Sequence, residues 1–572
     1  SRTPRVFAAF VLGVNEGIYP VRVTDDDIFS SPDREYLKTI GLELAPGRGE
    51  RIIEEQFLLY TALTRAGGYL WLSYVQADNE GKGTAPSYVI RRLKELFPAL
   101  GEQRITIEPE GSDDLSFISH PRRTLGHLAG KLREAKAGHR INEIWWSVYQ
   151  WAAADNRQRE VLQRIIAGLR HKNQDGPLKE ETIRTLYGNP LRVSVSKIES
   201  FRRCPFSYFA SFALKLKKRP VFQLEAPGLG QFYHAVLKTA GEQLFYDGHT
   251  WGDLSPAACV NLVNETVEKI APRLQSEILL SSARYKYLAR KIRQVITRSV
   301  LTLAEHDRRG CFRPRELELS FGPGGKLPPL KLQLESGQSI EVEGRIDRID
   351  YAENTTGIYL RVIDYKMGDE RLQLPEMYYG LRLQLITYLH AALSLMPQHS
   401  GQPLKAGGLL YFRIQDPLLH CESAPAATEL EREILKMMKM RGFIIADPGV
   451  AGLMDDKLGV DGYRTSELIP VNLLKDGAFD GRSAVLETGQ IEALLRHAEQ
   501  LLAQSGADIL QGVVDINPYK MQSQTACTHC RFSSVCQFDE LLEDNVYNHL
   551  HRLTPALIWR SLGFAVQEEK DG

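Results

Sequence analysis

The stretch SIEVEGRIDRIDYAENTTGIYLRVIDYKMG, at residues 339–368, constrains the fold more than any other part of the sequence. Two runs rich in β-branched residues flank AENTTG, which contains turn-forming residues, so the stretch is predicted to be a β-hairpin. Asp347 lies on the first strand. Asp364 and Lys366 lie two residues apart on the second strand, so their side chains point to the same face. The hairpin therefore brings two carboxylates and one ammonium group together on neighbouring strands.

This combination of side chains is typical of a divalent metal site. Carboxylates bind a hard cation such as Mg²⁺ through oxygen. The cation lowers the pKa of a bound water and neutralises charge on a phosphate, and a lysine ammonium orients that water or stabilises a developing oxyanion. On an exposed hairpin the same residues would form cross-strand ion pairs. The apolar neighbours Val362 and Ile363 favour a place inside a sheet, where unpaired carboxylates are costly, so we expect the metal site.

Three other segments could complete this site. In RPRELELSFG, Glu316 and Glu318 are expected on one face of a strand, and either could support the metal. In APGLGQFYHAVLK, His234 falls in the first turns of a predicted helix, where a single histidine is more often a packed core residue than a ligand. In MYYGLRLQLITYLHAAL, Gln384 and Tyr388 are four residues apart and share a helix face.

A second candidate metal site lies near the end of the sequence. The stretch ACTHCRFSSVCQF places Cys527, Cys530 and Cys536 at ligand spacing, and three thiolates rarely finish a site. His529 could complete a local zinc site, although its position between two C-x-x-C ligands disfavours this. A distant cysteine is the alternative. The remaining cysteines in unrelated contexts are interpreted as structural thiols: Cys259, Cys311 and Cys421.

A helix is predicted between the strand-like LRVSV and the proline at residue 205. Ser196 and Glu199 form an S-x-x-E pattern, which predicts a capping box and a helix that begins at Ser196. This helix carries Cys204 near its end.

Two basic stretches are candidates for binding nucleic acid. Residues 201–220 and 284–299 each contain six basic side chains and no acidic one, although Lys+Arg and Asp+Glu both number 71 in the whole chain. Such runs are more often solvated faces, but interleaved Phe and Tyr favour nucleic acid. The two runs indicate segregated charge. The predicted DNA-binding residues are Arg202, Arg203, Lys215, Lys217 and Lys218.

The first part of the sequence resembles a piece of a nucleotide-driven motor. RVFAAFVLGVNEGIYP predicts a buried strand and a turn, EEQFLLYTALTRA a helix, and YLWLSYV a second strand. An ordinary strand–helix–strand unit fits, but both pieces resemble the second motor domain of superfamily 1 helicases, in which the arginine matching Arg65 faces the nucleotide phosphates. A G-x-x-x-x-G-K-[ST] loop is absent from the sequence. We therefore do not expect this chain alone to hydrolyse ATP.

Length and composition limit the class of protein. The 572 residues are enough for two to four domains. Seven cysteines, without a signal peptide, argue against a secreted disulfide framework. The sequence has no apolar run of the length that spans a membrane. We expect a cytoplasmic protein without a membrane partner.

The motifs together resemble a known family. G-x-x-D, D-x-K and Q-x-x-x-Y, preceded by a helical histidine, resemble the RecB-type nuclease module of the PD-(D/E)xK superfamily. One cysteine before this module and three after it resemble the iron–sulfur clasp of the AddB family, the second subunits of bacterial AddAB helicase–nucleases. The resemblance runs from the N-E-G-x-x-P turn to Cys536.

The resemblance implies a role for each matching residue. It implies Mg²⁺ ligands, a catalytic lysine, a Q-x-x-x-Y motif that positions DNA, and a [4Fe–4S] cluster in which Cys204 is the fourth ligand. The implied metal ligands are His234, Asp347, Asp364 and the backbone carbonyl of Tyr365; the implied catalytic residues are Asp347, Asp364, Lys366, Gln384 and Tyr388; the implied cluster ligands are Cys204, Cys527, Cys530 and Cys536. Met367 departs from the small polar residue usual after D-Y-K, and we expect it to affect only packing.

The resemblance also implies fold, activity and partners. It implies an α/β protein: part of a helicase-like domain (1–120), a helical connector (121–190), a nuclease domain with a mixed central sheet flanked by helices (191–545) and a tail (546–572). The implied activity is 5′→3′ degradation of single-stranded DNA in a heterodimer with an AddA-type subunit, which processes double-strand breaks for homologous recombination. Since much of the helicase-like half is missing, we do not expect recognition of the Chi sequence. The alternatives are a DNA-binding scaffold with an inactive site and a helicase motor.

Overall fold

The computed structural model describes residues 5–23, 29–42, 44–78, 81–110, 114–173, 176–217, 226–273, 283–397, 402–419, 426–540, 542 and 545–564. The chain divides into two compact units, Ser1–Arg170 and His171–Gly572. The predicted boundaries near residues 120, 190 and 545 stay predictions. No helix within the described ranges has both the length and the apolar character needed to cross a membrane.

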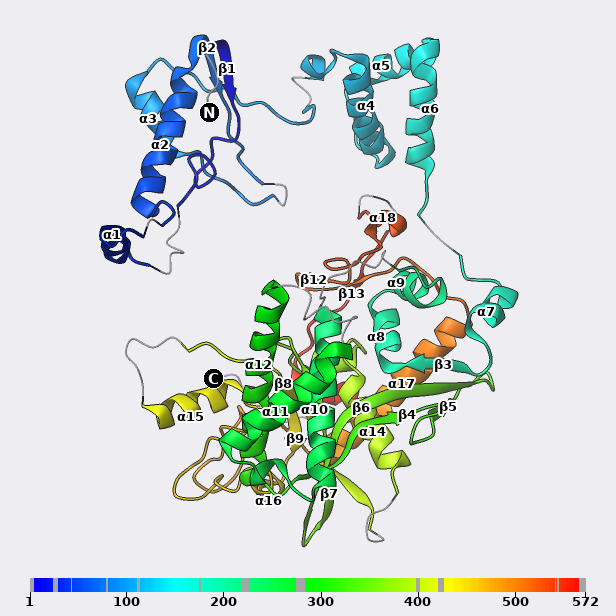
Figure 1. Cartoon of the computed structure of the whole chain (residues 1–572). Helices are drawn as coiled ribbons and strands as arrows, with labels where there is room; N and C mark the ends of the chain where they lie inside the picture. Colours follow the sequence, from blue (N-terminus) through cyan, green and yellow to red (C-terminus); the bar gives the residue numbers. More distant parts are fainter. Residues whose placement is uncertain are drawn as a thin grey trace. The chain divides into compact units, whose positions relative to one another are not determined.

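The first unit begins with a strand–helix–strand arrangement, as predicted (Figure 1). Strand β1 (Val6–Val11) pairs in parallel with β2 (Ala66–Leu72), and α2 (Arg48–Thr64) lies between them in sequence. Arg65 is the C-terminal cap of α2. Two further helices belong to this part: α1 (Ser31–Thr39) and α3 (Tyr88–Leu96).

The rest of the first unit is helical. Trp145 is fully buried, and its Nε1 donates a hydrogen bond to Asp114 Oδ2 at 3.1 Å. Leu125 and Leu128 pack in the same apolar cluster, so the Trp-rich sequence joins helices. The elements are η1 (Asp114–Phe117), α4 (Pro121–Lys136), α5 (Glu143–Ala154) and α6 (Asn156–Arg170).

The second unit is built on a mixed β-sheet with the strand order β10-β9-β8-β7-β6-β3, in which β4 and β5 also pair with β6. The predicted hairpin is confirmed as the antiparallel pair β6 and β7, whose register joins Asn354 to Gly357 at the turn. Strands β7 and β8 are parallel. The strands are β3 (Leu191–Ser194), β4 (Arg313–Phe321), β5 (Leu330–Gln333), β6 (Ser339–Asn354), β7 (Gly357–Lys366), β8 (Leu404–Arg413), β9 (Arg441–Ile445) and β10 (Val485–Leu486).

Helices cover both faces of this sheet, which confirms the predicted mixed sheet flanked by helices (Figure 1). Helices α10 (Ala226–Tyr246), α11 (Pro256–Ile270) and α12 (Ala283–Arg308) pack on one another and lie over one face. Helices α14 (Gln384–Leu395) and α17 (Thr488–Leu510) pack together over the other face. The interior is one large apolar core shared by sheet and helices.

Shorter elements complete the second unit. The cysteine-rich stretch lies in a small sheet of three short strands with the order β12-β11-β13. These elements are β11 (Tyr519–Met521), β12 (Gln524–Thr525), β13 (Asn548–His549) and α18 (Ser533–Cys536). The remaining helices are α7 (Glu180–Tyr187), α8 (Val195–Arg203), α9 (Pro205–Tyr208), η2 (Phe209–Ala213), η3 (Trp251–Asp253), η4 (Ala271–Arg273), α13 (Leu374–Tyr378), α15 (Ala427–Met437), α16 (Pro448–Gly452) and α19 (Pro555–Ser561).

The predicted capping box at Ser196 is wrong. Helix α8 begins at Val195, its N-cap is Ser194, and no side chain caps it. Ser196 therefore lies inside the helix. The carboxylate of Glu199 is buried and instead accepts hydrogen bonds from the backbone N–H groups of Leu383 and Gln384. A tertiary contact has replaced the local one that the sequence pattern predicts.

Candidate functional site

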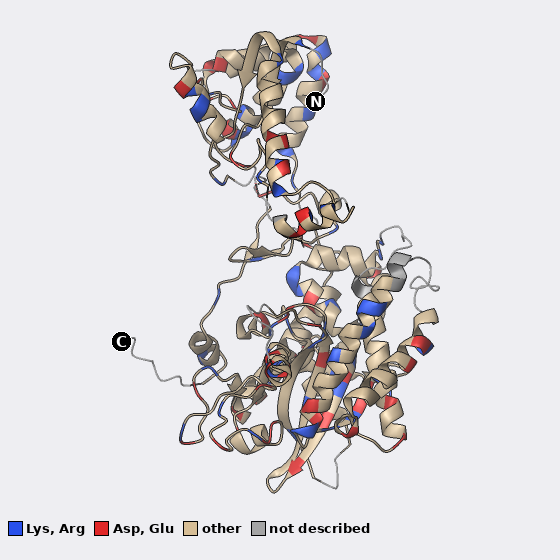
Figure 2. Cartoon of the chain, turned by 60° about the vertical axis from the view of Figure 1, so that its left-hand side comes forward, with Lys and Arg blue, Asp and Glu red and all other residues tan. Residues whose placement is uncertain are grey.

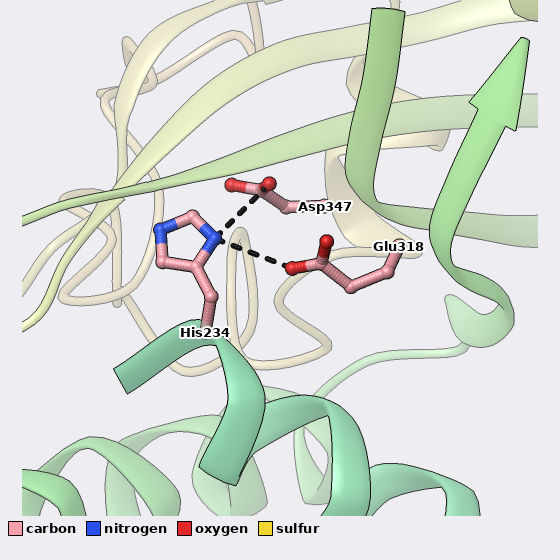
Figure 3. Close-up of side chains that lie close together, drawn as sticks. All are labelled: His234, Glu318 and Asp347. Carbon is pink, nitrogen blue, oxygen red and sulfur yellow. Dashed lines mark hydrogen bonds and ion pairs between the residues drawn. The ribbon is translucent and has the colours of Figure 1, made fainter. Parts of the chain in front are cut away.

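Three side chains from three different elements meet at the end of the sheet (Figure 3). His234 comes from α10, Glu318 from β4 and Asp347 from β6. His234 Nδ1 lies 3.2 Å from Asp347 Oδ1 and 3.3 Å from Glu318 Oε1. One ligand atom from each residue lies within 4.8 Å of the others, which is the spacing of groups that share one cation.

The charges of this cluster require a positive partner. The two carboxylates are almost fully buried, with side-chain exposures of 5% for Glu318 and 7% for Asp347. Burial lowers the pKa of His234, but hydrogen bonds and charge from Asp347 and Glu318 outweigh it and raise the pKa to about 10. The cluster is therefore a site for positive charge, which a proton on His234 or a divalent cation supplies.

The backbone of Tyr365 lies at the same site. Its carbonyl oxygen is 3.2 Å from His234 Nε2, and its N–H donates to Asp347 Oδ2 at 2.8 Å. Strand β7 thus presents a peptide group between the histidine and the aspartate. This agrees with the predicted place of the Tyr365 carbonyl among the metal ligands.

Asp364 is buried beside the cluster with incomplete hydrogen bonding. Its side chain is 2% exposed, and Oδ2 lies 2.5 Å from Lys366 Nζ, but that oxygen makes no hydrogen bond of acceptable geometry with any described residue. Burial, and next the charge of Asp347, raise the pKa of Asp364 to about 7, although Lys366 lowers it. A buried carboxylate oxygen without a hydrogen-bond donor fits a cation ligand, so the donor set here fits a hard divalent ion.

Lys366 leads from Asp364 to a short chain of polar groups. Its Nζ donates to Gln384 Oε1 at 3.0 Å, and Gln384 Nε2 donates to the Tyr388 hydroxyl at 3.2 Å. Gln384 and Tyr388 therefore share a face of α14, as predicted. The Tyr388 ring packs edge-on against Phe321 at 6.0 Å between centroids.

The structure distinguishes the two glutamates of β4. Lys326 Nζ donates to both carboxylate oxygens of Glu316, so Glu316 has a partner away from the cluster. Glu318 reaches the cluster with a left-handed backbone, φ 51°, in a strand whose pairing with β6 is irregular after Pro314. Such backbone is costly for a residue other than glycine and concentrates at functional sites. The two side chains do not serve one site together, which corrects the expected equivalence.

Four predicted cysteine ligands line a single cavity. Cys204, Cys527, Cys530 and Cys536 surround it together with apolar side chains such as Phe538. Burial, ahead of the nearby thiols, raises the pKa of Cys204 to about 11. An electron-poor metal centre is what allows such a thiol to ionise in an apolar cavity. The donor set fits the predicted cluster, in which Cys204 comes from a distant part of the sequence.

Surrounding residues hold the cysteine loop. Asn173 Nδ2 donates to the carbonyl oxygen of Cys536 at 2.8 Å. The Tyr547 hydroxyl hydrogen-bonds the Cys527 thiol. His529 is exposed and does not line the cavity, which weakens the alternative of a local zinc site with His529 as ligand.

The predicted DNA-binding residues are in different surroundings. Arg202 Nε donates to the Tyr379 carbonyl at 3.2 Å and Arg203 Nη2 to the Leu381 carbonyl at 3.3 Å, so both guanidinium groups have structural partners. Lys215 and Lys217 are exposed. Lys218 and Cys421 lie outside the described residues. A role of these basic residues in binding DNA stays a prediction.

The second basic stretch, on α12, is less suited to phosphate than its sequence indicates. Arg298 Nη1 lies 2.9 Å from Glu431 Oε2, and Arg293 Nη2 lies 3.5 Å from Glu268 Oε1. Figure 2 shows basic and acidic segments interspersed along the helices of this unit. The predicted segregation of charge is therefore weakened by tertiary ion pairs that the sequence does not reveal.

Two side chains at the site have roles that sequence reasoning missed. Arg345 Nε lies 2.7 Å from Glu318 Oε2 and holds that carboxylate toward His234. Glu199 holds the start of α14. Both contacts join residues far apart in the sequence, and no local pattern predicts either of them.

The sequence is similar to known families over most of its length. Residues 192–537 match the family described as "PD-(D/E)XK nuclease superfamily". Residues 110–168 match the one described as "ATP-dependent helicase/deoxyribonuclease AddB fifth domain".

Several relatives are named as one of the subunits of an "ATP-dependent helicase/deoxyribonuclease". The relative from Pelotomaculum thermopropionicum is 46% identical over 566 residues, which cover 98% of this chain and 48% of the relative. The relative from Desulforudis audaxviator is 43% identical and covers 100% of this chain and 49% of its own length. The chain thus spans about half the length of the curated relatives it matches. The resemblance to the AddB family is confirmed.

Proposed function

Because the chain belongs to the PD-(D/E)XK nuclease superfamily, we propose that its second unit is a Mg²⁺-dependent deoxyribonuclease that hydrolyses phosphodiester bonds. One observation carries this proposal: His234, Glu318 and Asp347 converge on one point beside the buried Asp364 and Lys366. Buried acids without enough donors are costly to maintain, and a cation together with a phosphate would satisfy them.

The cation would be held by His234, Asp347, Asp364 and the Tyr365 carbonyl, with Glu318 as a further ligand or as a support for His234. When bound, it would supply a water of lowered pKa and would neutralise charge on the phosphate.

The other roles belong to the chain's own side chains. Gln384 accepts a hydrogen bond from Lys366 and so fixes the ammonium group beside Asp364. In this position the ammonium stabilises negative charge that develops on the phosphate oxygens, a contribution that is typically large in a site with little water. Tyr388 holds the other end of the Gln384 amide. The pair thereby sets the distance between the substrate backbone and Lys366.

The substrate and the partner follow from the relatives' names and from the resemblance. The name of a subunit of an "ATP-dependent helicase/deoxyribonuclease" supports a DNA substrate and a second subunit, which we infer to be of the AddA type. We further propose 5′→3′ degradation of single-stranded DNA unwound from double-strand breaks during homologous recombination, in the cytoplasm. Polarity and pathway rest on the family resemblance.

We also propose that the four cysteines hold a [4Fe–4S] cluster that joins the two ends of the nuclease domain. The support is the shared cavity, lined by all four cysteines and without His529. Four thiolates are the usual ligands of such a cluster. Its role would be structural, since it ties Cys204 to the segment that begins at Cys527.

A DNA-binding scaffold with an inactive site is the second candidate. The intact set of Asp347, Asp364 and Lys366 argues against it, since an inactive site has no need for buried carboxylates that lack hydrogen-bond donors.

Digestion of single-stranded DNA labelled at either end tests the proposed function. With Mg²⁺ the chain should release labelled products, with the 5′ label released first, and EDTA should stop the reaction. Binding without digestion at any Mg²⁺ concentration would favour the scaffold.

A further inference from the structure

Helix α8 and the start of α14 are joined by a buried carboxylate. Glu199 Oε1 accepts hydrogen bonds from the backbone N–H groups of Leu383 at 2.7 Å and Gln384 at 3.0 Å. The side chain belongs to a residue that is 9% exposed. One oxygen atom therefore satisfies two backbone donors from a segment that lies far along the chain from α8.

Helix α14 depends on this contact because it has no cap of its own. Its N-cap is Leu383, which has no side-chain acceptor for the first N–H groups of the helix. Those groups need an acceptor, and negative charge is favoured at the positive end of the helix dipole. Glu199 supplies both from another element.

The same helix end carries the residue that touches Lys366. Gln384 is the first residue of α14. Its backbone N–H is held by Glu199, its Oε1 accepts from Lys366 Nζ at 3.0 Å, and its Nε2 donates to Tyr388 at 3.2 Å. Backbone and side chain of Gln384 are thus fixed by three separate hydrogen bonds, of which Glu199 makes the first.

Two further contacts from α8 hold the preceding segment. Arg202 donates to the carbonyl oxygen of Tyr379 and Arg203 to that of Leu381. Cys204 follows immediately as the C-terminal cap of α8. The helix that ends at the cysteine cavity therefore fixes the approach to α14 at successive points.

We propose that Glu199 is a positioning residue of the nuclease site: its carboxylate fixes the N-terminus of α14, so that the Gln384 amide holds the Lys366 ammonium beside Asp364. This inference rests on the proposed function. It assigns to α8 the task of linking the cysteine cavity to Lys366.

Four variants of the full chain test this role. Glu199→Leu removes the acceptor, Glu199→Gln keeps one oxygen acceptor at the same distance, Gln384→Ala removes the amide, and the double variant Glu199→Leu/Gln384→Ala removes both. The matched control is Glu467→Leu, because Glu467 is also buried and its carboxylate pairs with Arg309 at 3.0 Å and with Arg432, away from α14.

The kinetic expectation separates positioning from a general loss of stability. Glu199→Leu should lower kcat on single-stranded DNA by about ten- to a hundredfold, as expected for a displaced reactive group, with little change in KM. Glu199→Gln should recover most of kcat. The double variant should be no slower than Gln384→Ala, because Glu199 acts through Gln384. Multiplied losses in the double variant, or a folded Glu199→Gln as slow as Glu199→Leu, would overturn the proposal.

Hydrogen exchange gives a readout that does not depend on activity. Amide exchange in a peptide covering residues 381–388 should accelerate in Glu199→Leu and stay slow in Glu199→Gln and Glu467→Leu. Equal acceleration in the Glu467→Leu control, or none in Glu199→Leu, would show that Glu199 does not hold α14. If Glu199→Leu does not fold, Glu199→Asp, which withdraws the carboxylate by one methylene, takes its place with the same expectations. If the wild type hydrolyses no DNA, the proposed function fails, and the exchange rates alone decide whether Glu199 positions α14.

Discussion

The metal site and the cysteine cavity differ in what holds their residues in place. The metal-site residues lie on β4, β6, β7, α10 and α14, all of which pack into the large core of the second unit. Most of the cysteine cavity is built from strands of two or three residues and a four-residue helix. Its apolar cluster contains only four buried residues, Cys204, Phe206, Ala210 and Phe532, among the described residues. The protein holds the first site, whereas the ligands of the second site hold the protein.

The hairpin behind the metal site shows how firmly the first site is built. Asp350 and Arg361 are cross-strand partners of β6 and β7, and Arg361 Nη2 lies 2.8 Å from Asp350 Oδ2. Arg348 pairs with the other oxygen of Asp350 at 2.6 Å. All three are at most 1% exposed. Breaking one partner of such a buried group is strongly destabilising, so this hairpin keeps its register without a bound cation.

The largest effect should follow from removing a cysteine ligand. Cys204→Ala should yield colourless, iron-poor protein that proteases cut near both ends of the nuclease domain, because the cluster closes the loop from Cys204 to Cys527. The measurement is iron and zinc content of protein kept anaerobic, with limited proteolysis. The wild type should contain about four irons per chain.

The control for this variant is Cys311→Ala, since Cys311 is an exposed cysteine outside the cavity. It should stay brown and folded, and so should Cys421→Ala. One zinc retained in both wild type and Cys204→Ala would instead mean a local zinc site, and the comparison between the two regions would lose its basis.

A smaller effect should distinguish the two glutamates of β4. Glu318→Gln should weaken Mg²⁺ binding by about tenfold or more, as for other residues that hold or orient metal ligands, since Glu318 contacts His234. Glu316→Gln should leave the affinity unchanged, because Glu316 pairs with Lys326. Calorimetric titration of both variants checks this, and neither should lose its fold. Equal losses in the two variants would mean that Glu318 has no special place.

The smallest effect concerns the basic residues. Neutralising Lys215, Lys217 and Lys218 together should reduce the salt dependence of single-stranded DNA binding, with the slope of log K against log salt falling by about 2 in magnitude. Arg298→Gln is the control, because Arg298 already pairs with Glu431. Binding titrations at several salt concentrations measure both. An unchanged slope in the triple variant would identify these lysines as a solvated face.

The sequence predicts the parts of the site that depend on local periodicity. The alternation along β6 and β7 predicts the hairpin, and the spacing of Gln384 and Tyr388 predicts their shared face. The family resemblance adds His234, the Tyr365 carbonyl and the convergence of Cys204 with three distant cysteines. These features are repeated wherever the pattern occurs, which is why motifs reveal them.

The features that sequence reasoning missed depend on tertiary contacts. The pattern around Ser196 is that of a capping box, but Glu199 finds better donors at the start of α14. The basic run on α12 loses free charge to Glu268 and Glu431, which come from other helices. The left-handed residue Glu318 breaks the strand alternation that would make it equivalent to Glu316. In each case a partner that is distant in sequence, or a local break in the backbone, decides the outcome.

The most direct test of the metal-site assignment compares hydrolysis and thermal unfolding in Asp364→Ala. We expect hydrolysis of single-stranded DNA with Mg²⁺ to fall about a hundredfold or more. We also expect that Tm does not fall, because Asp364 is a buried carboxylate whose pKa is raised by burial and by Asp347, so its charge costs stability. Lys366→Ala should lose hydrolysis in the same way. An Asp364→Ala chain that digests DNA at the wild-type rate would contradict the assignment.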